Sequence, residues 1–411
     1  MSNIIWPKPD ADILKYETND SYKFNLKCSG NISSDFSAFA DYFFQAAEKV
    51  TEYILNRGYI GELDCNFFAL AYLYRHSLEL KLKAIAFKYI TAESRKAFIR
   101  DTFHNLIEIL KHITPYVSRE IEYDIGAYQW LKMLLQDMEP IDKDSDAFRY
   151  PFKIAVKNNK VEHIKQYSIK PFFEGQKHIN LIAFADKMEL SFKILCSYYC
   201  NEKKKFDSYN NYTTIFLEEG GEYYAQSVIG YNYKTDFYGP IIKGYWESAK
   251  YLGNLITNTP SLKNVYFFPM CYLYRNALEL QLKQIWFEEC AASFQERCKK
   301  LSETKHSLLK LWNIIYEDVC HHSQNEEDQS VISYAENYIT QIHALDSSSS
   351  VFRYPVDKET NYHFKKNKYL DAKNVNQYFD SLSTFLGALE TMMTNHNQNQ
   401  ADMQAEYTGY F

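Results

Sequence analysis

Apolar residues recur at helical spacing along most of the chain, and this pattern predicts a mainly α-helical protein. The clearest apolar stripe lies within residues 66–90, where leucines recur three to five positions apart. Positions three or four apart share one face of a helix, so we expect this segment to be a central helix. Weaker stripes of the same kind predict further helices in residues 36–56, 101–118, 120–138 and 176–200.

Two segments show a different pattern, which predicts strands. Residues 152–168 alternate around Asn158 and Asn159, which predicts a β-hairpin with a tight turn at the asparagines. Residues 356–370 occupy the same place later in the chain and predict a second hairpin. Both segments are basic and aromatic, which suits gripping a nucleic-acid strand or, alternatively, protecting an exposed strand edge from aggregation.

The same motifs occur twice in the chain, in the same order. The sequence YLYRHSLELKLK begins at Tyr72, and YLYRNALELQLK, with nine of twelve residues identical, begins at Tyr272. HNLIEILKHI at His104 then matches HSLLKLWNII at His306, and FRYP at residues 148–151 matches FRYP at residues 352–355. The separations are 200, 202 and 204 residues. A unit of this length indicates a duplicated domain and not a short solenoid repeat.

The duplication divides the chain into two tandem helical bundles, each with a small β-hairpin element. We expect the first repeat to span residues 1–200 and the second to span residues 213–396. The connecting segment NEKKKFDSYNNY is polar and turn-rich, as a domain boundary should be. Residues 397–411 are polar and are expected to form a flexible tail.

Composition narrows the classes of function. The chain has 411 residues and a net charge of −6, which argues against a strongly basic, sequence-blind nucleic-acid binder. We expect no association with a membrane, because no apolar run is long enough to span one. The N-terminus lacks the layout of a signal peptide, so a cytoplasmic location is predicted and the 8 cysteines are interpreted as thiols.

No cofactor and no metal are predicted. The chain has only 13 glycines and no glycine-rich phosphate-binding loop. Cys196 and Cys200 are one helical turn apart, and residues 320–322 read Cys-His-His. Neither group has the paired spacing of a structural zinc site.

A charged stripe runs along the repeated helix, and it carries the candidate chemistry. It consists of Arg75, Glu79 and Lys83 with His76 beside them, and in the second copy of Arg275, Glu279 and Lys283 with Asn276 beside them. Residues four apart share a helix face. A partly buried arginine on such a helix must be paired, because an unpaired buried charge is costly.

Two interpretations of this stripe are open. In the structural one, Arg75 pairs with Glu79 and ties down the FRYP turn, or Arg149 pairs with Glu79, so that an ion network joins helix and loop. In the functional one, Arg75 and Arg149 supply forked donors that suit a phosphodiester. His104 or His76 would then move protons near neutral pH.

On these residues the chain resembles the HEPN superfamily of prokaryotes. In that family an arginine followed by Asn, Asp or His lies on the core helix of a small bundle, and Arg75–His76 and Arg275–Asn276 match that opening. The family motif closes with a histidine four to six positions after the arginine. This chain has other residues at those positions, namely Glu79, Leu80 and Lys81, and Glu279, Leu280 and Gln281.

The resemblance implies an antiviral-defence or toxin-type protein that binds RNA or another nucleic acid where its two bundles meet. Cleavage would be metal-independent, and whether the chain cuts RNA or only binds it stays open. A protein partner of a defence system and a homo-oligomer are also expected. The candidate catalytic residues are Arg75, His76, Glu79, His104, Arg149, Arg275, Glu279, His306 and Arg353. Two alternatives remain, a non-catalytic adaptor, sensor or inhibitor with structural stripes, and a receptor for a nucleotide or peptide.

Overall fold

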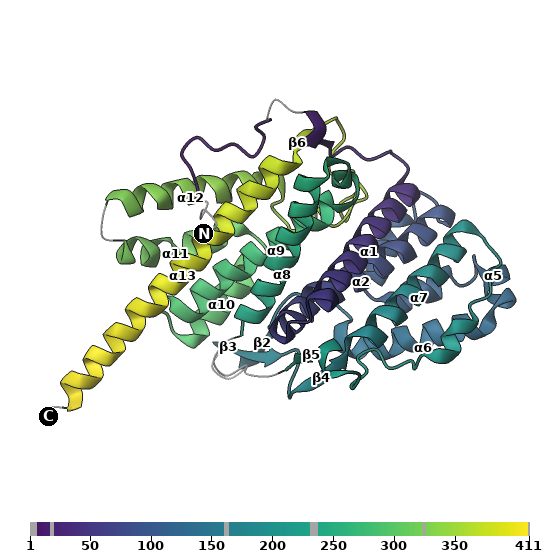
Figure 1. The fold of residues 1–411 in the computed structure, drawn as a ribbon, viewed down its shortest axis with the longest axis horizontal. Coiled ribbons are helices and arrows are strands. Elements are labelled where there is room, and N and C mark those ends of the chain that lie inside the picture. Colours follow the sequence, from purple (N-terminus) through teal and green to yellow (C-terminus); the bar gives the residue numbers. More distant parts are fainter. Residues whose placement is uncertain (1–5, 17–19, 160–163, 231–236, 324–325, 410–411) are drawn as a thin grey trace.

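The computed structural model describes residues 6–16, 20–159, 164–230, 237–323 and 326–409. Helices dominate it, and the only sheets in this part of the chain are two-stranded, as the predicted fold class requires (Figure 1). The helices of the first repeat are α1 (Ile32–Arg57), α2 (Ile60–Tyr89), α3 (Arg95–Thr102), α4 (Leu106–Ile113), α5 (Ser118–Tyr123), α6 (Ile125–Asp142) and α7 (Leu181–Cys200). Those of the second are α8 (Gly239–Asn258), α9 (Lys263–Gln284), α10 (Phe294–Thr304), α11 (Leu308–His322), α12 (Glu326–Leu345) and α13 (Ala372–Gly409).

Most predicted helices are present, with breaks that the apolar pattern did not reveal. The prediction of one continuous helix at residues 101–118 is wrong, because α3 ends at Thr102 and α4 begins only at Leu106. Between them Phe103 has a positive φ of 47°, which no α-helix can contain. The helix expected at residues 120–138 is divided between α5 and α6 at Asp124, whose side chain caps α6.

Four helices form the centre of the molecule. Helix α1 packs along α2, α8 packs along α9, and the two pairs meet where α2 contacts α8 and α1 contacts α9. Side chains are buried continuously from Leu63 to Phe87 in α2, because that helix is surrounded by protein on every side. Gly244 allows α8 to approach α2 closely, since a Cβ there would lie 1.9 Å from the carbonyl oxygen of Cys65.

Three short antiparallel pairs supply the strands. They are β2 (Phe152–Asn159) with β3 (Ile164–Pro171), β1 (Lys23–Asn25) with β6 (Tyr369–Asp371), and β4 (Lys177–Asn180) with β5 (Gln226–Ile229). The first hairpin is therefore confirmed, but the turn predicted at its asparagines is wrong. Asn158 lies within β2, opposite Lys165, and the connecting residues 160–163 lie outside the described residues. The second predicted hairpin is reduced to one bridge between Val356 and Tyr362.

The repeats exchange their terminal strands. Strand β1 precedes α1 in the first repeat, yet it pairs with β6, which precedes α13 in the second. Strand β5 precedes α8 in the second repeat and pairs with β4, which precedes α7 in the first. Each opening strand therefore pairs with the closing strand of the other repeat, which ties the two bundles together.

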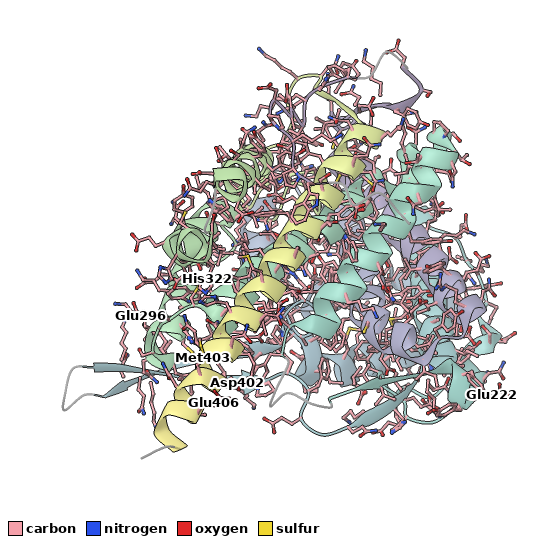
Figure 2. The ribbon with its side chains drawn as sticks, turned by 60° about the vertical axis from the view of Figure 1, so that its left-hand side comes forward. Glu222, Glu296, His322, Asp402, Met403 and Glu406 are labelled. Atoms are coloured by element: carbon pink, nitrogen blue, oxygen red, sulfur yellow. The ribbon has the colours of Figure 1, made fainter. Side chains whose placement is uncertain are left out.

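Residues 397–411 are expected to form a flexible tail, but α13 continues through this segment as a helix to Gly409. This end of α13 extends away from the body of the molecule in Figure 1, and Figure 2 labels Asp402, Met403 and Glu406 along it. Asn397 still contacts the body, because its side-chain amide donates to the carbonyl oxygen of Glu289 at 3.0 Å. Among the described residues, no helix has both the length and the apolar character needed to cross a membrane.

Candidate functional site

The first repeat places its charged stripe deep in the core. Glu79 on α2 is fully buried and is the central acceptor. Its Oε2 accepts from Arg75, and its Oε1 lies 2.7 Å from the ammonium of Lys83. The same Oε1 lies 2.9 Å from Nδ1 of His104 and 2.8 Å from the hydroxyl of Tyr354. Glu79 therefore neutralises two buried cations and holds one imidazole and one phenol.

Arg75 joins three elements of the first repeat. Its Nη2 donates to the carbonyl oxygen of His104, in the turn between α3 and α4. Its Nε lies 3.1 Å from Oδ2 of Asp142, at the end of α6. These contacts tie α2 to the segments that carry His104 and the FRYP turn. The structural interpretation of this arginine is thereby supported.

The second repeat reproduces the same centre around Glu279 on α9. Its Oε1 lies 2.7 Å from Lys283 and 3.0 Å from Nδ1 of His306, and its Oε2 accepts from Arg275 at 3.2 Å. The hydroxyl of Tyr150 donates to Oε1 at 3.1 Å. Arg275 also donates to the carbonyl oxygen of His306, as its counterpart does in the first repeat.

Each centre is completed by the FRYP turn of the other repeat. Tyr354 reaches the first centre and Tyr150 reaches the second. Backbone carbonyl groups of each FRYP turn also contact the other repeat. The ring of His76 contacts the carbonyl oxygen of Arg353 at 3.1 Å, and the amide of Asn276 donates to that of Arg149 at 3.5 Å. The two centres therefore form only when both repeats are present.

Local backbone geometry positions the two histidines. Phe103 and Lys305 precede them directly and have positive φ values of 47° and 52°. Such a conformation is costly for a residue with a side chain, and it turns each imidazole back toward its glutamate. Directly afterwards, Asn105 caps α4 and Ser307 caps α11 through side-chain oxygens.

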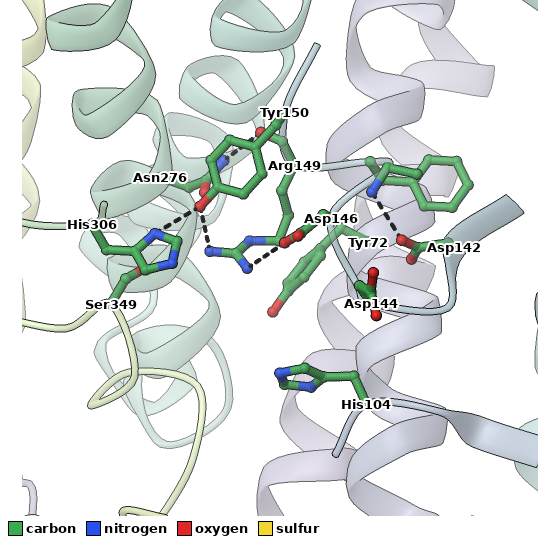
Figure 3. A network of polar contacts seen from close by, with 12 residues as sticks. Tyr72, His104, Asp142, Asp144, Asp146, Arg149, Tyr150, Asn276, His306 and Ser349 are labelled. Carbon is green, nitrogen blue, oxygen red and sulfur yellow. Dashed lines mark hydrogen bonds and ion pairs between the residues drawn. The ribbon is translucent and has the colours of Figure 1, made fainter. Parts of the chain in front are cut away.

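A cleft of about 870 Å³ lies between the repeats. Both histidines line it, together with Arg149 and Arg353 from the two FRYP turns. Figure 3 shows His104 and His306 on either side of Arg149, the one from the first repeat and the other from the second. The other charged residues of the lining are Lys83, Lys305, Lys310, Lys358, Asp144, Asp146, Glu303, Asp357 and Glu359. Cations and carboxylates are therefore nearly balanced in the cleft.

The buried carboxylates remain ionised. Burial acts to raise the pKa of Glu79, but Lys83, His104 and Arg75 outweigh it and hold that pKa well below its usual value. The equivalent cations act on Glu279 in the same direction. Since an ionised carboxylate can only accept, Nδ1 of each histidine must be the donor, and Nε2 keeps its lone pair.

Both cleft histidines are biased toward the neutral form. Burial lowers the pKa of His104 to about 4, although Glu79 acts in the opposite direction. For His306, Glu279 acts to raise the pKa, but burial and the neighbouring cations lower it overall. The side chain of His306 is 39% exposed and that of His104 is 15% exposed, so the second histidine is the more accessible one.

The structure divides the predicted site residues into two groups. It brings His104, Arg149, His306 and Arg353 together at the cleft. The remaining candidates are buried behind it and do not line it; they are Arg75, His76, Glu79, Arg275 and Glu279. Their candidacy as catalytic groups is not supported by this position, although Glu79 and Glu279 orient the histidines.

One predicted pairing is corrected, and several contributors were missed. Arg149 does not pair with Glu79; its Nη2 donates to Tyr150 at 2.7 Å, and its Nη1 lies 3.5 Å from Asp146. The role of the two FRYP tyrosines was missed, although both belong to the repeated motif; Tyr354 is buried and Tyr150 half-buried beside the glutamates. Asp142 was missed as well, although an aspartate stands at the same distance before FRYP in both copies, Asp142 in the first and Asp346 in the second.

No group of three or more His, Cys, Asp or Glu side chains within the described part of the chain is arranged to hold a metal ion. Comparisons of the chain with protein-family models, with curated proteins and with solved structures found no match.

Proposed function

We propose that this protein binds RNA in the cleft between its repeats and cleaves it without a metal, as part of a prokaryotic defence or toxin system. The observation that supports this proposal is the convergence of two Glu–His–Tyr centres on one cleft that also holds two arginines. The resemblance of the Arg75 and Arg275 segments to the HEPN superfamily supplies the cellular role.

The geometry suits attack of a ribose 2′-hydroxyl on the adjacent phosphate. His104 is neutral near pH 7, so its Nε2 can take the proton of the 2′-hydroxyl as the new O–P bond forms. His306 is more exposed and, in its protonated form, can give a proton to the departing 5′-oxygen as the P–O bond breaks. Arg149 would stabilise the charge on the phosphoryl oxygens. The products would carry a 2′,3′-cyclic phosphate and a 5′-hydroxyl.

The size and charge of the cleft favour recognition of a short segment. A volume of about 870 Å³ lies within the range of small-molecule pockets, so one or two nucleotides would fill it. The carboxylates of Asp144, Asp146 and Glu303 among the lining would repel a long polyanion. We therefore expect the protein to engage a nucleotide or two of an exposed single strand and not a duplex.

A non-catalytic interaction module is the second candidate. Its support is the complete burial of the Arg75–Glu79 and Arg275–Glu279 pairs, which act as internal ties between helix and loop. On this reading the cleft histidines would position the FRYP turns of the partner repeat. RNA would then be bound without being cut, or not be bound.

Incubation of the purified chain with end-labelled total RNA in EDTA tests the proposal. We expect cleavage by the unaltered protein, a loss of at least 100-fold in His104→Gln and in His306→Gln, and cyclic phosphate ends on the products. His178→Gln is the matched control, because His178 is exposed on β4 and lies outside the cleft lining. Intact RNA in every tube would remove the enzyme claim, and retained binding by filter assay would favour the second candidate.

A further inference from the structure

The two FRYP turns share their backbone hydrogen bonds but differ in charge, since Lys143, Asp144 and Asp146 of the first correspond to Ser347, Ser348 and Ser350 of the second. In the first turn the amides of Arg149 and Tyr150 donate to the carbonyl oxygen of Asp146. In the second, the amides of Arg353 and Tyr354 donate to that of Ser350. The preceding serines, at positions 145 and 349, both have positive φ, 64° and 59°. Asp146 and Ser350 are therefore structurally equivalent.

This difference leaves Arg353 without a counter-charge. Arg149 has the carboxylate of Asp146 at 3.5 Å. No carboxylate within the described ranges lies within 4.0 Å of the guanidinium of Arg353, which is only 6% exposed. Its Nε donates to the carbonyl oxygen of Ser349 at 2.6 Å, and its Nη1 reaches the hydroxyl of Tyr72 at 3.5 Å. Its Nη2 has no hydrogen-bond partner in the described part of the protein.

The surroundings of Arg353 add to this excess of positive charge. Burial and, next, the charge of Arg149 both act to lower the pKa of Arg353, while the neighbouring tyrosine hydroxyls hold it above its usual value. Two like charges thus lie close together at the buried wall of the cleft. A buried arginine with no anion is costly, and an anion bound from solution would remove that cost.

The lining near Arg353 offers donors that suit a tetrahedral anion. Ser348, Ser350, Lys310 and Lys358 line the cleft, and the hydroxyls of the two serines lie 2.7 Å apart. A planar guanidinium edge binds two oxygens of a phosphate, and lysine adds a point charge. The carboxylates of Asp357 and Glu359 on the same lining would disfavour a continuous phosphate backbone and permit a single terminal group.

We propose that the Arg353 side of the cleft is a binding site for a terminal phosphate, a phosphomonoester dianion held by Arg353 and the serine hydroxyls of the second FRYP turn. The inference deepens the RNA-binding function proposed above, on which it rests for the nature of the ligand. It makes the cleft directional, because the Arg149 side already has its own carboxylate and offers no equivalent site. A bound RNA would accordingly enter by a phosphorylated end.

Exchange of the residues at positions 146 and 350 between the turns provides the test. Titration calorimetry with inorganic phosphate should show one site per chain in the unaltered protein. Ser350→Asp copies the first turn and should weaken phosphate binding at least tenfold. Asp146→Ser copies the second turn and should add a second site. Each variant introduces the residue that the other repeat already accommodates, so both are expected to fold.

Ser347→Asp is the matched control, because it adds the same charge on the cleft lining at an exposed position. An equal loss in Ser347→Asp, or no phosphate binding by the unaltered chain, would overturn the inference. Dinucleotides with a 5′-phosphate, a 3′-phosphate or neither distinguish the source of the group, and the unphosphorylated one should bind at least tenfold more weakly. RNA cleavage measured on the same variants separates the two proposals. If RNA is still cleaved but phosphate is not bound, only the proposal of a terminal-phosphate site is contradicted. If phosphate is bound but RNA is not, only the proposed RNA function is contradicted.

Discussion

The two glutamate centres share a plan but are supported differently. In the first, Arg75 contacts Glu79 and a second carboxylate, that of Asp142, at 3.1 Å. In the second, Glu279 is the only carboxylate within 4.0 Å of Arg275 among the described residues. The contacts that hold the repeats together have thus been kept in both copies, while those at the margin of each centre have diverged. The divergence allows the two sides of one cleft to take different roles.

The largest difference is expected on removing the charge of each glutamate. Glu279→Gln leaves the buried Arg275 and the half-buried Lys283 without a carboxylate, and we expect the free energy of unfolding to fall by about 3–5 kcal/mol. Glu79→Gln should cost about 2 kcal/mol less, because Arg75 keeps Asp142. Urea denaturation at pH 7.5 measures both. Adding Asp142→Asn to Glu79→Gln should abolish the difference, and equal losses in the two single variants would show that Asp142 contributes nothing.

The next largest difference in stability is expected between variants of Tyr354 and Tyr150, the two tyrosines that each reach the centre of the other repeat. Tyr354→Phe removes one donor to Glu79 and is expected to lower the free energy of unfolding by about 1 kcal/mol. Tyr150→Phe removes the equivalent donor to Glu279 and also the hydroxyl that accepts from Arg149. We therefore expect it to lower the free energy of unfolding by about 2 kcal/mol. Tyr223→Phe, an exposed tyrosine, serves as the control in the same urea series. A larger loss in Tyr354→Phe than in Tyr150→Phe would contradict the assigned partners.

The smallest difference concerns the dependence of stability on pH. The pKa of His104 is about 4 when folded and near 6.5 when unfolded, so the unfolded chain binds more protons between these values. The contribution of His104 is therefore complete above pH 6.5 and is lost as the pH falls toward 4. Between pH 7.5 and 5.5 it amounts to about 1 kcal/mol.

His104→Gln should remove that part of the pH dependence, and His306→Gln should remove less, because His306 is more exposed. Asp142 acts in the opposite sense, since burial raises its pKa to about 6 and its contribution is lost as the pH rises through that value. It is present in every variant, so differences between variants isolate the histidines. Urea midpoints at the two pH values provide the measurement, and parallel curves for all three proteins would refute the assignment.

The sequence predicts the helices of each repeat better than it predicts the contacts between the two repeats. The apolar stripe of residues 66–90 marks α2 well, although this buried helix also carries the charged residues Arg75, Glu79 and Lys83. The break at Phe103 was missed because a positive φ outside glycine leaves no signature in an apolar pattern. The duplication was visible, but a repeated motif cannot say whether its tyrosine serves its own bundle or the other one.

The candidate site was predicted only in part, because the sequence again did not show which contacts join the two repeats. Helical spacing correctly placed Arg75 beside Glu79, since residues four apart must share a face. Spacing cannot tell whether that face is open or covered, and here FRYP turns cover it. Alignment of the two turns would have exposed the difference between Asp146 and Ser350, which is the clearest sequence sign that the arginines behind them are unequal.

The strand exchange has a consequence for how the chain is made. Strand β1 leaves the ribosome long before its partner β6, which spans Tyr369–Asp371. At typical rates of synthesis, the opening strand waits roughly 20–70 s before its partner exists. During that interval the segment that carries β1 must be kept from pairing with another nascent chain, so this architecture can close only after β6 has been made.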